Sequence, residues 1–299
     1  MNNFIYYFYN IQVNDIVCNN KYCSFLYNGY VYKLYVIDEN INNDFLIELD
    51  KRLLGNTLIN EIIFNRDGKI ISSYNNKAYM LMRIFVNLKK KISLDEISYL
   101  ANTWTVKNLK INWAMLWERK IDYLEKMINE NGKKYPIITD SFNYFVGMAE
   151  NAISYYNNTG INDNYIYVIS HKRIRINDTI DVIYNPLNII FDYRVRDVAE
   201  YIKRAFFDDN KNIFNEIDIY FRNYPLTETD ARLLVARLMY PSFYFEMYED
   251  ILIDNIEEKI IIKIVDRLKE YEKYLGSIID YLNKLYGVEE IKWLNNYYK

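Results

Sequence analysis

The chain has a single histidine, His171, and the segment that begins with it combines an imidazole with several charged side chains. Residues 171–178 read His-Lys-Arg-Ile-Arg-Ile-Asn-Asp, which places an imidazole, three cations and a carboxylate within eight residues. The segment lies between two apolar runs, 165–170 and 179–184, which we predict as short strands. Such a loop could bind an anionic ligand or partner segment. We favour a solvated loop whose cations form ion pairs with Asp178 and Asp181.

Scarce residue types exclude several catalytic classes. A zinc site of the His/Cys kind would need His171 together with Cys18 and Cys23, which stand far upstream. No two of the eight glycines lie within ten residues of each other, so a Walker loop and a dinucleotide-binding glycine motif are absent. No serine stands in a G-x-S-x-G elbow, which excludes a hydrolase of that type.

The overall composition is that of a folded chain without a strong electrostatic field. The 299 residues are long enough for one large domain or two lobes, and 51% of them are hydrophobic. Lys and Arg number 37 against 40 Asp and Glu, so the net charge of -3 gives no attraction for nucleic acid or anionic membranes. The 32 tyrosines are interpreted as core and surface fillers, because the cluster Tyr6, Tyr7 and Tyr9 lacks the basic partners of a base-stacking surface. We therefore expect no nucleic-acid partner.

The sequence favours a cytoplasmic protein with reduced cysteines. The first fifteen residues carry neither the basic region nor the apolar run of a signal peptide, and no later segment is apolar enough for a membrane span. Cys18 and Cys23 flank a predicted turn at Asn19-Asn20. A disulfide between them is geometrically allowed, but we favour two free thiols that act as small hydrophobic side chains.

The hydrophobic patterns predict strands first and helices afterwards. Alternating runs indicate strands within 4–17, 22–27 and 30–37, one helix at 45–54, and a second meander within 61–86. From residue 88 onwards helices dominate, and we expect the hinge between the two parts near Val86–Ser93. The predicted helices are 93–104, 111–132, one that begins at Thr139 or Asp140, 196–207, 211–222, 228–239, 242–252 and 255–285, with short strands at 165–170, 179–184 and 188–193.

This order of elements resembles the protein-kinase-like fold of the aminoglycoside-phosphotransferase type. The resemblance is carried by NRDGKIISSYNNKAYMLMRIF, by the helical segments INWAMLWERKIDYLEKMI and DSFNYFVGMAENAISYY, and by VISHKRI and NIIFDYRVRDVAEYIKRAF. The late segment ARLLVARLMYPSFYFEMYEDIL resembles the spore-coat kinase-like proteins of the CotS/YutH type. The resemblance implies an α+β, two-lobed fold. A small antiparallel β N-lobe with one helix would span 1–88, and a larger helical C-lobe would span 89–299 and carry a degenerate catalytic loop at about 168–193.

The loop departs from the family pattern at the residue that matters most. Active members carry a loop resembling H-G-D-x-x-x-x-N, in which the Asp deprotonates the attacking hydroxyl and the Asn helps to hold a metal ion. Here His171 is kept, Arg173 stands in place of the Asp, and Asp178 stands in place of the Asn. A guanidinium stays protonated and has no acceptor, so Arg173 cannot serve as the base.

The nucleotide and metal positions implied by the resemblance are weak. Lys33 matches the phosphate-binding lysine of the third strand, and Glu48 matches its partner on the following helix. We favour Lys33 on the solvated face of an edge-like strand and Glu48 as an exposed helix residue. Asp178 and Asp192 could together hold Mg²⁺. We favour Asp178 as a turn residue beside Thr179, and Asp192 as the ion-pair partner of Arg194 or Arg196.

Asp197 resembles the structural aspartate that caps the helix after the catalytic loop and braces that loop. The cations Lys172, Arg173 and Arg175, together with Arg194 and Arg196, could also form a positive floor.

Three functions remain open. We favour a non-catalytic kinase-like protein without a cofactor, a structural or scaffolding component with protein partners and a link to the spore coat. The second is a small-molecule phosphotransferase that depends on ATP and Mg²⁺ and uses Asp178 or Asp181 as its base. The third is a regulatory module that binds nucleotide without turnover. The substrate, the partners and the oligomeric state are left open by the sequence.

Overall fold

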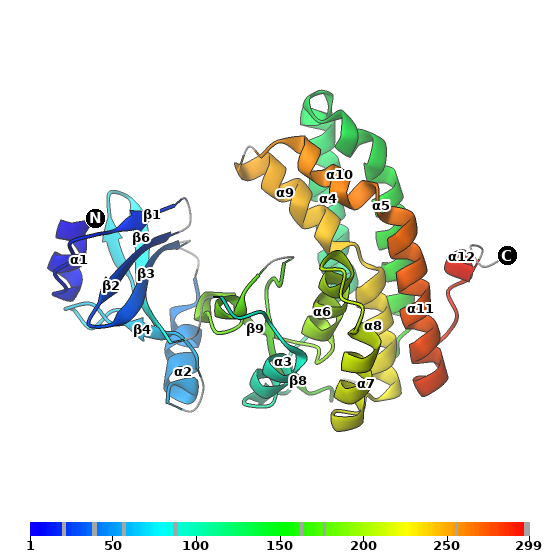
Figure 1. The fold of residues 1–299 in the computed structure, drawn as a ribbon, viewed down its shortest axis with the longest axis horizontal. Coiled ribbons are helices and arrows are strands. Elements are labelled where there is room, and N and C mark those ends of the chain that lie inside the picture. Colours follow the sequence, from blue (N-terminus) through cyan, green and yellow to red (C-terminus); the bar gives the residue numbers. More distant parts are fainter. Residues whose placement is uncertain are drawn as a thin grey trace. The chain divides into compact units, whose positions relative to one another are not determined.

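The computed structural model describes residues 1–19, 22–37, 41–55, 58–85, 89–161, 164–175, 178–254 and 256–295. The chain forms two compact units (Figure 1). The first contains Met1–Ile92 and Asp178–Ile189, and the second contains Ser93–Asn177 and Ile190–Lys299. The structure thus divides the predicted catalytic loop between the units. Residues 86–88 of the predicted hinge lie outside the described residues.

The first unit is built on an antiparallel sheet in which β3 is a central strand. The sheet has the order β1-β2-β3-β6-β4, and β5 also pairs with β6. Lys33 stands in the middle of β3, opposite Ser24 on one side and Met82 on the other. The strands are β1 (Val17–Cys18), β2 (Tyr22–Tyr27), β3 (Tyr30–Ile37), β4 (Glu61–Ile63), β5 (Ser72–Tyr74) and β6 (Lys77–Ile84).

The prediction of a strand within 4–17 is wrong at its beginning, because residues 2–9 form helix α1 (Asn2–Tyr9). The apolar side chains of Phe4, Ile5 and Tyr9 recur at helical spacing and pack together with β2, β3 and β6 in one hydrophobic cluster. Asn10 ends the helix in the left-handed conformation, with φ 57°. Packing against the sheet therefore overrides the strand propensity of the tyrosines and isoleucine.

The remaining parts of the first unit are helix α2 and the segment 178–189. Helix α2 (Asn43–Leu53) begins where the Asn42 side chain accepts a hydrogen bond from the Phe45 amide, so the predicted helix at 45–54 is confirmed. The predicted strand 179–184 is wrong, because Ile180–Val182 form a short 3-10 helix. This segment is bound to the unit by backbone hydrogen bonds from Asn60 to Tyr184 and from Ile180 to Lys90.

The second unit is helical around a three-stranded sheet with the order β7-β8-β9. Helix α5 packs against both α4 and α8, and α11 packs against α8 (Figure 1). No helix in the described parts of the chain is long and apolar enough to cross a bilayer. The elements are α3 (Leu94–Ala101), β7 (Thr105–Val106), α4 (Trp113–Asn131), α5 (Pro136–Asn157), β8 (Tyr167–His171), β9 (Ile189–Asp192), α6 (Arg196–Phe207), α7 (Ile213–Asn223), α8 (Glu228–Met239), α9 (Ser242–Asp254), α10 (Ile262–Val265), α11 (Leu268–Tyr286) and α12 (Lys292–Asn295).

Two helices of this unit differ from the prediction. Helix α5 begins at Pro136, before Thr139, because proline fits the first turn of a helix, where its missing amide proton is not needed. The long helix expected over 255–285 is broken into a 3-10 turn at Glu258–Ile261, helix α10 and helix α11. Arg267 precedes α11 with non-helical dihedral angles, φ -95° and ψ 8°, so the backbone changes direction there.

Candidate functional site

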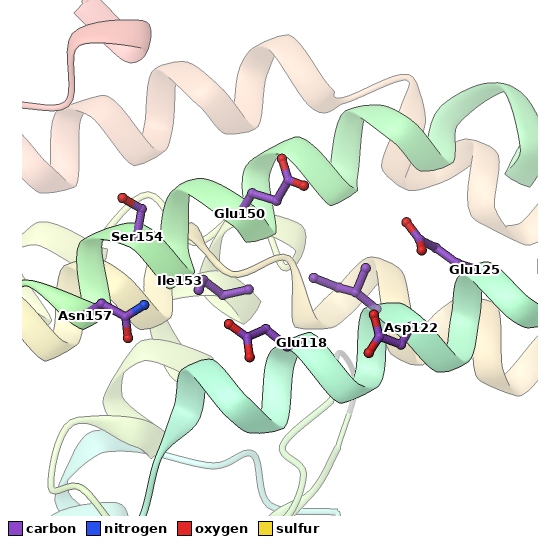
Figure 2. A pocket seen from close by; sticks show the side chains of 8 residues that line it. Glu118, Asp122, Glu125, Glu150, Ile153, Ser154 and Asn157 are labelled. Carbon is purple, nitrogen blue, oxygen red and sulfur yellow. The ribbon is translucent and has the colours of Figure 1, made fainter.

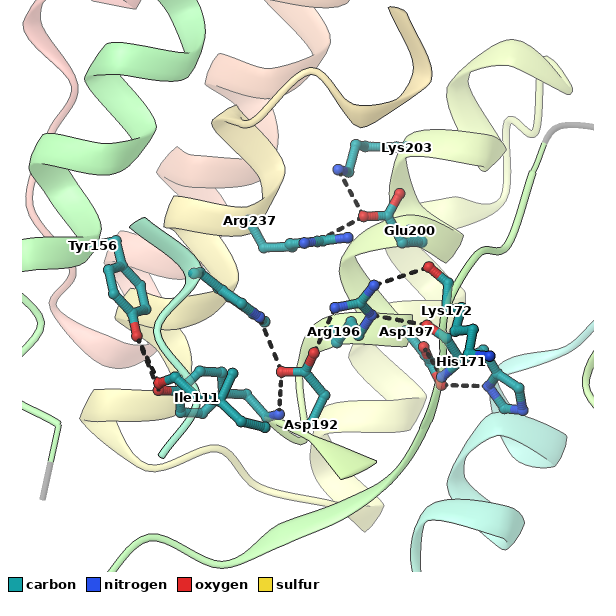
Figure 3. Close-up of polar contacts among 12 residues, drawn as sticks. Ile111, Tyr156, His171, Lys172, Asp192, Arg196, Asp197, Glu200, Lys203 and Arg237 are labelled. Atoms are coloured by element: carbon teal, nitrogen blue, oxygen red, sulfur yellow. Dashed lines mark hydrogen bonds and ion pairs between the residues drawn. The ribbon is translucent and has the colours of Figure 1, made fainter. Parts of the chain in front are cut away.

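The stem of the candidate catalytic loop is held by a buried histidine and an aspartate. His171 ends β8, is 1% exposed, and donates its backbone amide to Asp197 Oδ1 at 3.1 Å. Its ring Nδ1 lies 2.7 Å from Asp197 Oδ2 (Figure 3). Asp197 belongs to the first turn of α6, but the N-cap of that helix is Val195, without a side-chain cap. Asp197 thus contacts the loop as the resemblance implies, whereas its carboxylate does not occupy the capping position.

Arg196 fixes the first two carbonyl groups of the loop. Its Nε donates to the His171 carbonyl at 2.8 Å, and one terminal nitrogen donates to the Lys172 carbonyl at 2.9 Å. Its other terminal nitrogen lies 2.5 Å from Asp192 Oδ2 (Figure 3). One guanidinium therefore ties the end of β8 to the end of β9, which positions the loop from both sides.

Asp192, the implied metal ligand, has both oxygens engaged by protein groups. It ends β9 and is 2% exposed. Its Oδ1 accepts from Trp113 Nε1 at 2.9 Å and from the Tyr193 amide at 2.7 Å, while Oδ2 pairs with Arg196. Of the two partners expected for an ion pair, Arg196 is the one found. Each oxygen of this buried carboxylate therefore has a protein partner. Such partners offset the free-energy cost of removing a charged group from water.

Asp178, the other implied metal ligand, belongs to the first unit, whereas Asp192 belongs to the second. Among the described residues there is no group of three or more His, Cys, Asp and Glu side chains that could hold a metal ion. A Mg²⁺ site at Asp178 and Asp192 therefore stays a prediction. A cation at Asp192 would have to share the carboxylate with Arg196 and Trp113.

The arginines of the loop pair with acidic residues on α9. Arg173, at the place of the catalytic base, lies 2.9 Å from Glu249 Oε2. Arg175 forms a bidentate pair with Asp250 at 2.7 and 2.9 Å. Lys120 of α4 also forms an ion pair with Glu249. Arg173 and Arg175 therefore form ion pairs, with partners on α9 in addition to or in place of the expected Asp178 and Asp181. The pairing of these two arginines weighs against a positive floor built from them.

Glu246 lies on the same stretch of α9, 3.9 Å from Arg175. Burial and the negative charge of Glu200 raise its pKa to about 7, against the opposing influence of Arg173, Arg175 and Arg237.

A second buried network was missed by sequence reasoning. Glu200 of α6 accepts from Lys203 at 2.9 Å and from Arg237 at 2.7 Å (Figure 3). It also accepts from the Ser242 hydroxyl at 2.8 Å. Lys203 also donates to the Tyr240 carbonyl at 3.1 Å. Burial would raise the pKa of Glu200, but Lys203 and Arg237 overcome this and lower it to about 2. Burial in turn lowers the pKa of Lys203 to about 8. Glu200 and Lys203 are three residues apart in the sequence, and the same spacing is typical of ion pairs on the exposed face of a helix. The spacing alone therefore could not indicate that this pair is buried.

Lys33 is buried within the first unit, so its predicted place on a solvated, edge-like strand is wrong. The side chain belongs to a central strand and is 5% exposed as a residue. Its Nζ lies 2.7 Å from Asp181 Oδ2 and 4.6 Å from the centre of the Tyr22 ring. Asp181 Oδ1 also accepts from Thr179 at 2.5 Å. The ammonium is therefore neutralised by a carboxylate from the segment 178–189.

Glu48, the implied partner of Lys33, pairs instead with Arg52 one turn further along α2, at 2.5 Å. Its side chain is about half exposed, in agreement with the interpretation as an exposed helix residue. In the structure Lys33 pairs with Asp181 and Glu48 pairs with Arg52, in place of the Lys33–Glu48 pair that the family resemblance implies.

The expectation of free thiols is wrong, because Cys18 and Cys23 form a disulfide. The two residues are directly opposite each other on β1 and β2, with their Cα atoms 4.0 Å apart. The antiparallel register brings the sulfur atoms together, and the apolar side chains around Cys23 do not prevent it. Residues 20–21 at the predicted turn lie outside the described residues.

A groove of about 540 Å³ lies between α4 and α5 (Figure 2). Four carboxylates line it together with Ile121 and Ile153, and the described lining residues include no basic side chain. The clustered negative charge disfavours a nucleotide phosphate there. The carboxylates belong to Glu118, Asp122, Glu125 and Glu150.

Comparison with known proteins places the chain in a family. The family described as spore coat putative kinase YutH matches residues 2–283. The chain belongs to this family. The endospore coat-associated protein YutH of Bacillus subtilis (strain 168) is 25% identical over 270 residues, which cover 79% of each protein.

Solved structures show that the YutH-family fold of this chain is kinase-like. An aminoglycoside phosphotransferase from Alicyclobacillus acidocaldarius superposes with a TM-score of 0.63 and 9% identity, covering 92% of this chain and 93% of that one. A spectinomycin phosphotransferase in complex with ADP and spectinomycin gives a TM-score of 0.56 and 13% identity, covering 92% of each chain. The predicted fold class is thereby confirmed, with an antiparallel β N-terminal part and a larger helical C-terminal part.

Proposed function

We propose that this chain is a non-catalytic kinase-like protein that acts as a structural or scaffolding component through protein partners, in association with the spore coat. The observation that carries the proposal is the ion pair between Arg173 and Glu249 at the place of the catalytic base. Arg173 stays protonated at any physiological pH and has no lone pair with which to accept a proton. The transfer step therefore lacks its base.

Two further observations support the loss of phosphoryl transfer. Asp192, at the place of the metal ligand, already accepts hydrogen bonds from Trp113 and Tyr193 and pairs with Arg196. Lys33, at the place of the phosphate-binding lysine, is neutralised by Asp181. Binding of Mg²⁺ or of a nucleotide phosphate would have to replace these contacts, so we expect no cofactor.

The coat association rests on the family. The family is described as a spore coat putative kinase, and its curated relative is an endospore coat-associated protein. Because the fold is kept while the groups needed for transfer are substituted or internally paired, the surfaces of the fold are the part left for function. Coat or scaffold proteins are the partners that this reasoning favours.

A small-molecule phosphotransferase is the alternative, since the fold is shared with aminoglycoside phosphotransferases. It would use ATP and Mg²⁺, with Asp178 or Asp181 as the base. Asp181 already pairs with Lys33 and accepts a hydrogen bond from Thr179. Asp181 would therefore have to leave Lys33 before it could take a proton.

Thermal unfolding with and without ATP and Mg²⁺ separates the two functions. A ligand at about a hundred times its dissociation constant adds roughly 2.7 kcal/mol to the native state. We expect no Mg²⁺-dependent shift at millimolar ATP and no turnover. An Arg173→Asp variant introduces an aspartate at the position that the resemblance assigns to the catalytic base. We expect this variant to stay inactive, because Asp192 still pairs with Arg196 and Lys33 still pairs with Asp181. A shift that is lost in an Asp192→Ala variant that still folds would favour the alternative.

The coat association has its own test. The tagged chain would be produced in sporulating Bacillus subtilis that lacks its own YutH, and the extracted coat fraction would be probed for it. We expect the wild type and Arg173→Ala to enter the coat fraction equally, since the proposed role does not depend on transfer. Absence of both from the coat, with both present in the mother-cell fraction, would contradict a coat role.

A further inference from the structure

The disulfide Cys18–Cys23 has one accessible and one buried end. Cys18 lies in the two-residue strand β1 and is exposed. Cys23 is 8% exposed and belongs to the hydrophobic cluster between α1 and the sheet. An incoming thiolate would therefore meet the sulfur of Cys18 first, with Cys23 as the leaving group. The two ends of the bond are chemically inequivalent.

The residue next to the buried cysteine covers Lys33. Tyr22 directly precedes Cys23, and its ring lies 5.4 Å from that of Tyr35, the residue opposite it on β3. The Nζ of Lys33 lies 4.6 Å from the centre of the same Tyr22 ring. A cation over an aromatic face is attracted to it, so Tyr22 and Asp181 enclose the ammonium together.

The disulfide is the strongest connection between β1 and the rest of the sheet. Strand β1 contributes only two residues to the ladder, and Val17 is 73% exposed. The Asn19 amide donates to the Tyr22 carbonyl at 3.0 Å, and the Asn19 side chain accepts from the Tyr22 amide at 2.9 Å. So short a pairing is marginal in water without a covalent link. The link thus adds to the two hydrogen bonds that join Tyr22, the first residue of β2, to Asn19.

We propose that the Cys18–Cys23 disulfide is a site of thiol exchange that controls access to Lys33. A thiolate of a small or protein thiol attacks the sulfur of Cys18, and a new mixed disulfide forms there. The bond to Cys23 breaks, and Cys23 leaves with the electron pair and takes a proton from water. A second thiolate then attacks the mixed disulfide, which leaves both cysteines as thiols and yields the oxidised disulfide of the attacking thiol.

Release of the link loosens β1 and Tyr22, and Lys33 becomes accessible beside Asp181. The proposal concerns access to the amine of Lys33 and holds whether or not the chain binds nucleotide. In the chain-entropy description, a link across a loop this short changes the opening equilibrium by roughly thirtyfold. Acylation of Lys33 should therefore become roughly thirtyfold faster on reduction.

The experiment uses the full chain and glutathione, followed by alkylation of free thiols and peptide mass spectrometry. Glutathione is expected on Cys18 and the alkyl group on Cys23. Acylation by acetic anhydride is then compared in oxidised and reduced chains, with Lys126, whose side chain is 74% exposed, as the internal standard. The Cys18→Ser/Cys23→Ser variant should behave as the reduced chain does. Reduced wild type blocked with iodoacetamide serves the same purpose where that variant fails to fold.

Three results would overturn the proposal. The first is the absence of exchange with millimolar glutathione in the folded chain. The second is a mixed disulfide found equally on Cys23. The third is an unchanged rate of Lys33 acylation, relative to Lys126, after both cysteines are reduced.

Discussion

Replacing Asp192 with alanine separates the two proposed functions most clearly. A phosphotransferase would lose binding of Mg²⁺-nucleotide, whereas a non-catalytic protein would lose folding stability. In an active kinase the metal-binding aspartate serves catalysis, and its removal abolishes binding of Mg²⁺-nucleotide with little effect on folding. In this chain the carboxylate is buried and holds Trp113, Tyr193 and Arg196. Removing one partner of a buried ion pair leaves the other unpaired, at a cost of about 3 to 5 kcal/mol. We therefore expect Asp192→Ala to lower the free energy of unfolding by about that amount.

The assay is urea unfolding followed by tryptophan fluorescence. The four tryptophans, at positions 104, 113, 117 and 293, all belong to the second unit, so their signal reports the unit that contains Asp192. Asp192→Asn keeps an acceptor for Trp113 and loses the charge opposite Arg196, and we expect a smaller loss of about 2 kcal/mol. Asp122→Ala removes an exposed carboxylate from α4 and is the control, with a change within about 0.5 kcal/mol. A loss below about 1 kcal/mol for Asp192→Ala, together with loss of a Mg²⁺-ATP thermal shift, would refute the reasoning.

Three other perturbations test separate parts of the structure. Glu246 has a folded pKa of about 7, above its ordinary value of 4.5, so the folded chain retains a proton that the unfolded chain releases. Its contribution to stability is therefore complete below about pH 4.5 and is lost as the pH rises to 7. In urea unfolding between these pH values, Glu246→Gln should gain up to roughly 3 kcal/mol relative to wild type, and a constant difference would contradict this. Lys33→Ala leaves the Asp181 carboxylate without its cation and should lower the free energy of unfolding by about 3 kcal/mol. Hydrogen exchange of the β3 amides measures this loss, and unchanged protection of those amides would argue against the ion pair. Ile5→Ala opens a cavity under α1, because Ile5 is fully buried. We expect thermal unfolding to show a loss of about 2 to 4 kcal/mol in the free energy of unfolding. An unchanged stability would show that α1 does not pack against the sheet.

Much of the helical part could be predicted because its ends carry local signals. The predicted helices 196–207 and 228–239 coincide with α6 and α8. At the start of α8, Thr227 accepts from the Asp230 amide while the Asp230 side chain accepts from the Thr227 amide, and Pro241 stops the helix soon after its end. Such signals act within a few residues of the chain, so they are visible without knowledge of the fold.

The elements that were predicted wrongly depend on distant contacts. Residues 2–9 have strand-like composition but become α1 because their apolar face packs on the sheet. The run 179–184 is apolar enough for a strand, yet Ile180 is bound to Lys90 and forms a 3-10 turn within the first unit. In both cases the packing partners lie outside the segment itself, in other elements of the first unit, so local propensity could not indicate them.

The contacts of the candidate site also fall into those that could be predicted from the sequence and those that could not. The contact between His171 and Asp197 and the pair between Asp192 and Arg196 were anticipated, because the family resemblance and the short sequence separation both pointed to them. The partners of Arg173 and Lys33 were not anticipated. Glu249 is 76 residues from Arg173, and Asp181 is 148 residues from Lys33. Nothing in the local spacing of these residues distinguishes them from exposed charges.

The unanticipated pairs also bear on how a kinase-like fold could persist without phosphoryl transfer, as we propose for this chain. An active site keeps charged groups poised for a ligand, and without that ligand they repel one another or remain poorly solvated. In this chain the cation at the base position pairs with Glu249, Lys33 pairs with Asp181, and Asp192 is satisfied by Arg196. These three ion pairs give each group a partner within its own unit, and of the three only Arg173 departs from the residue type that the family resemblance implies. Under the proposed function, a single Arg173→Asp substitution would be unfavourable, because it would place a carboxylate close to Glu249, the present partner of Arg173.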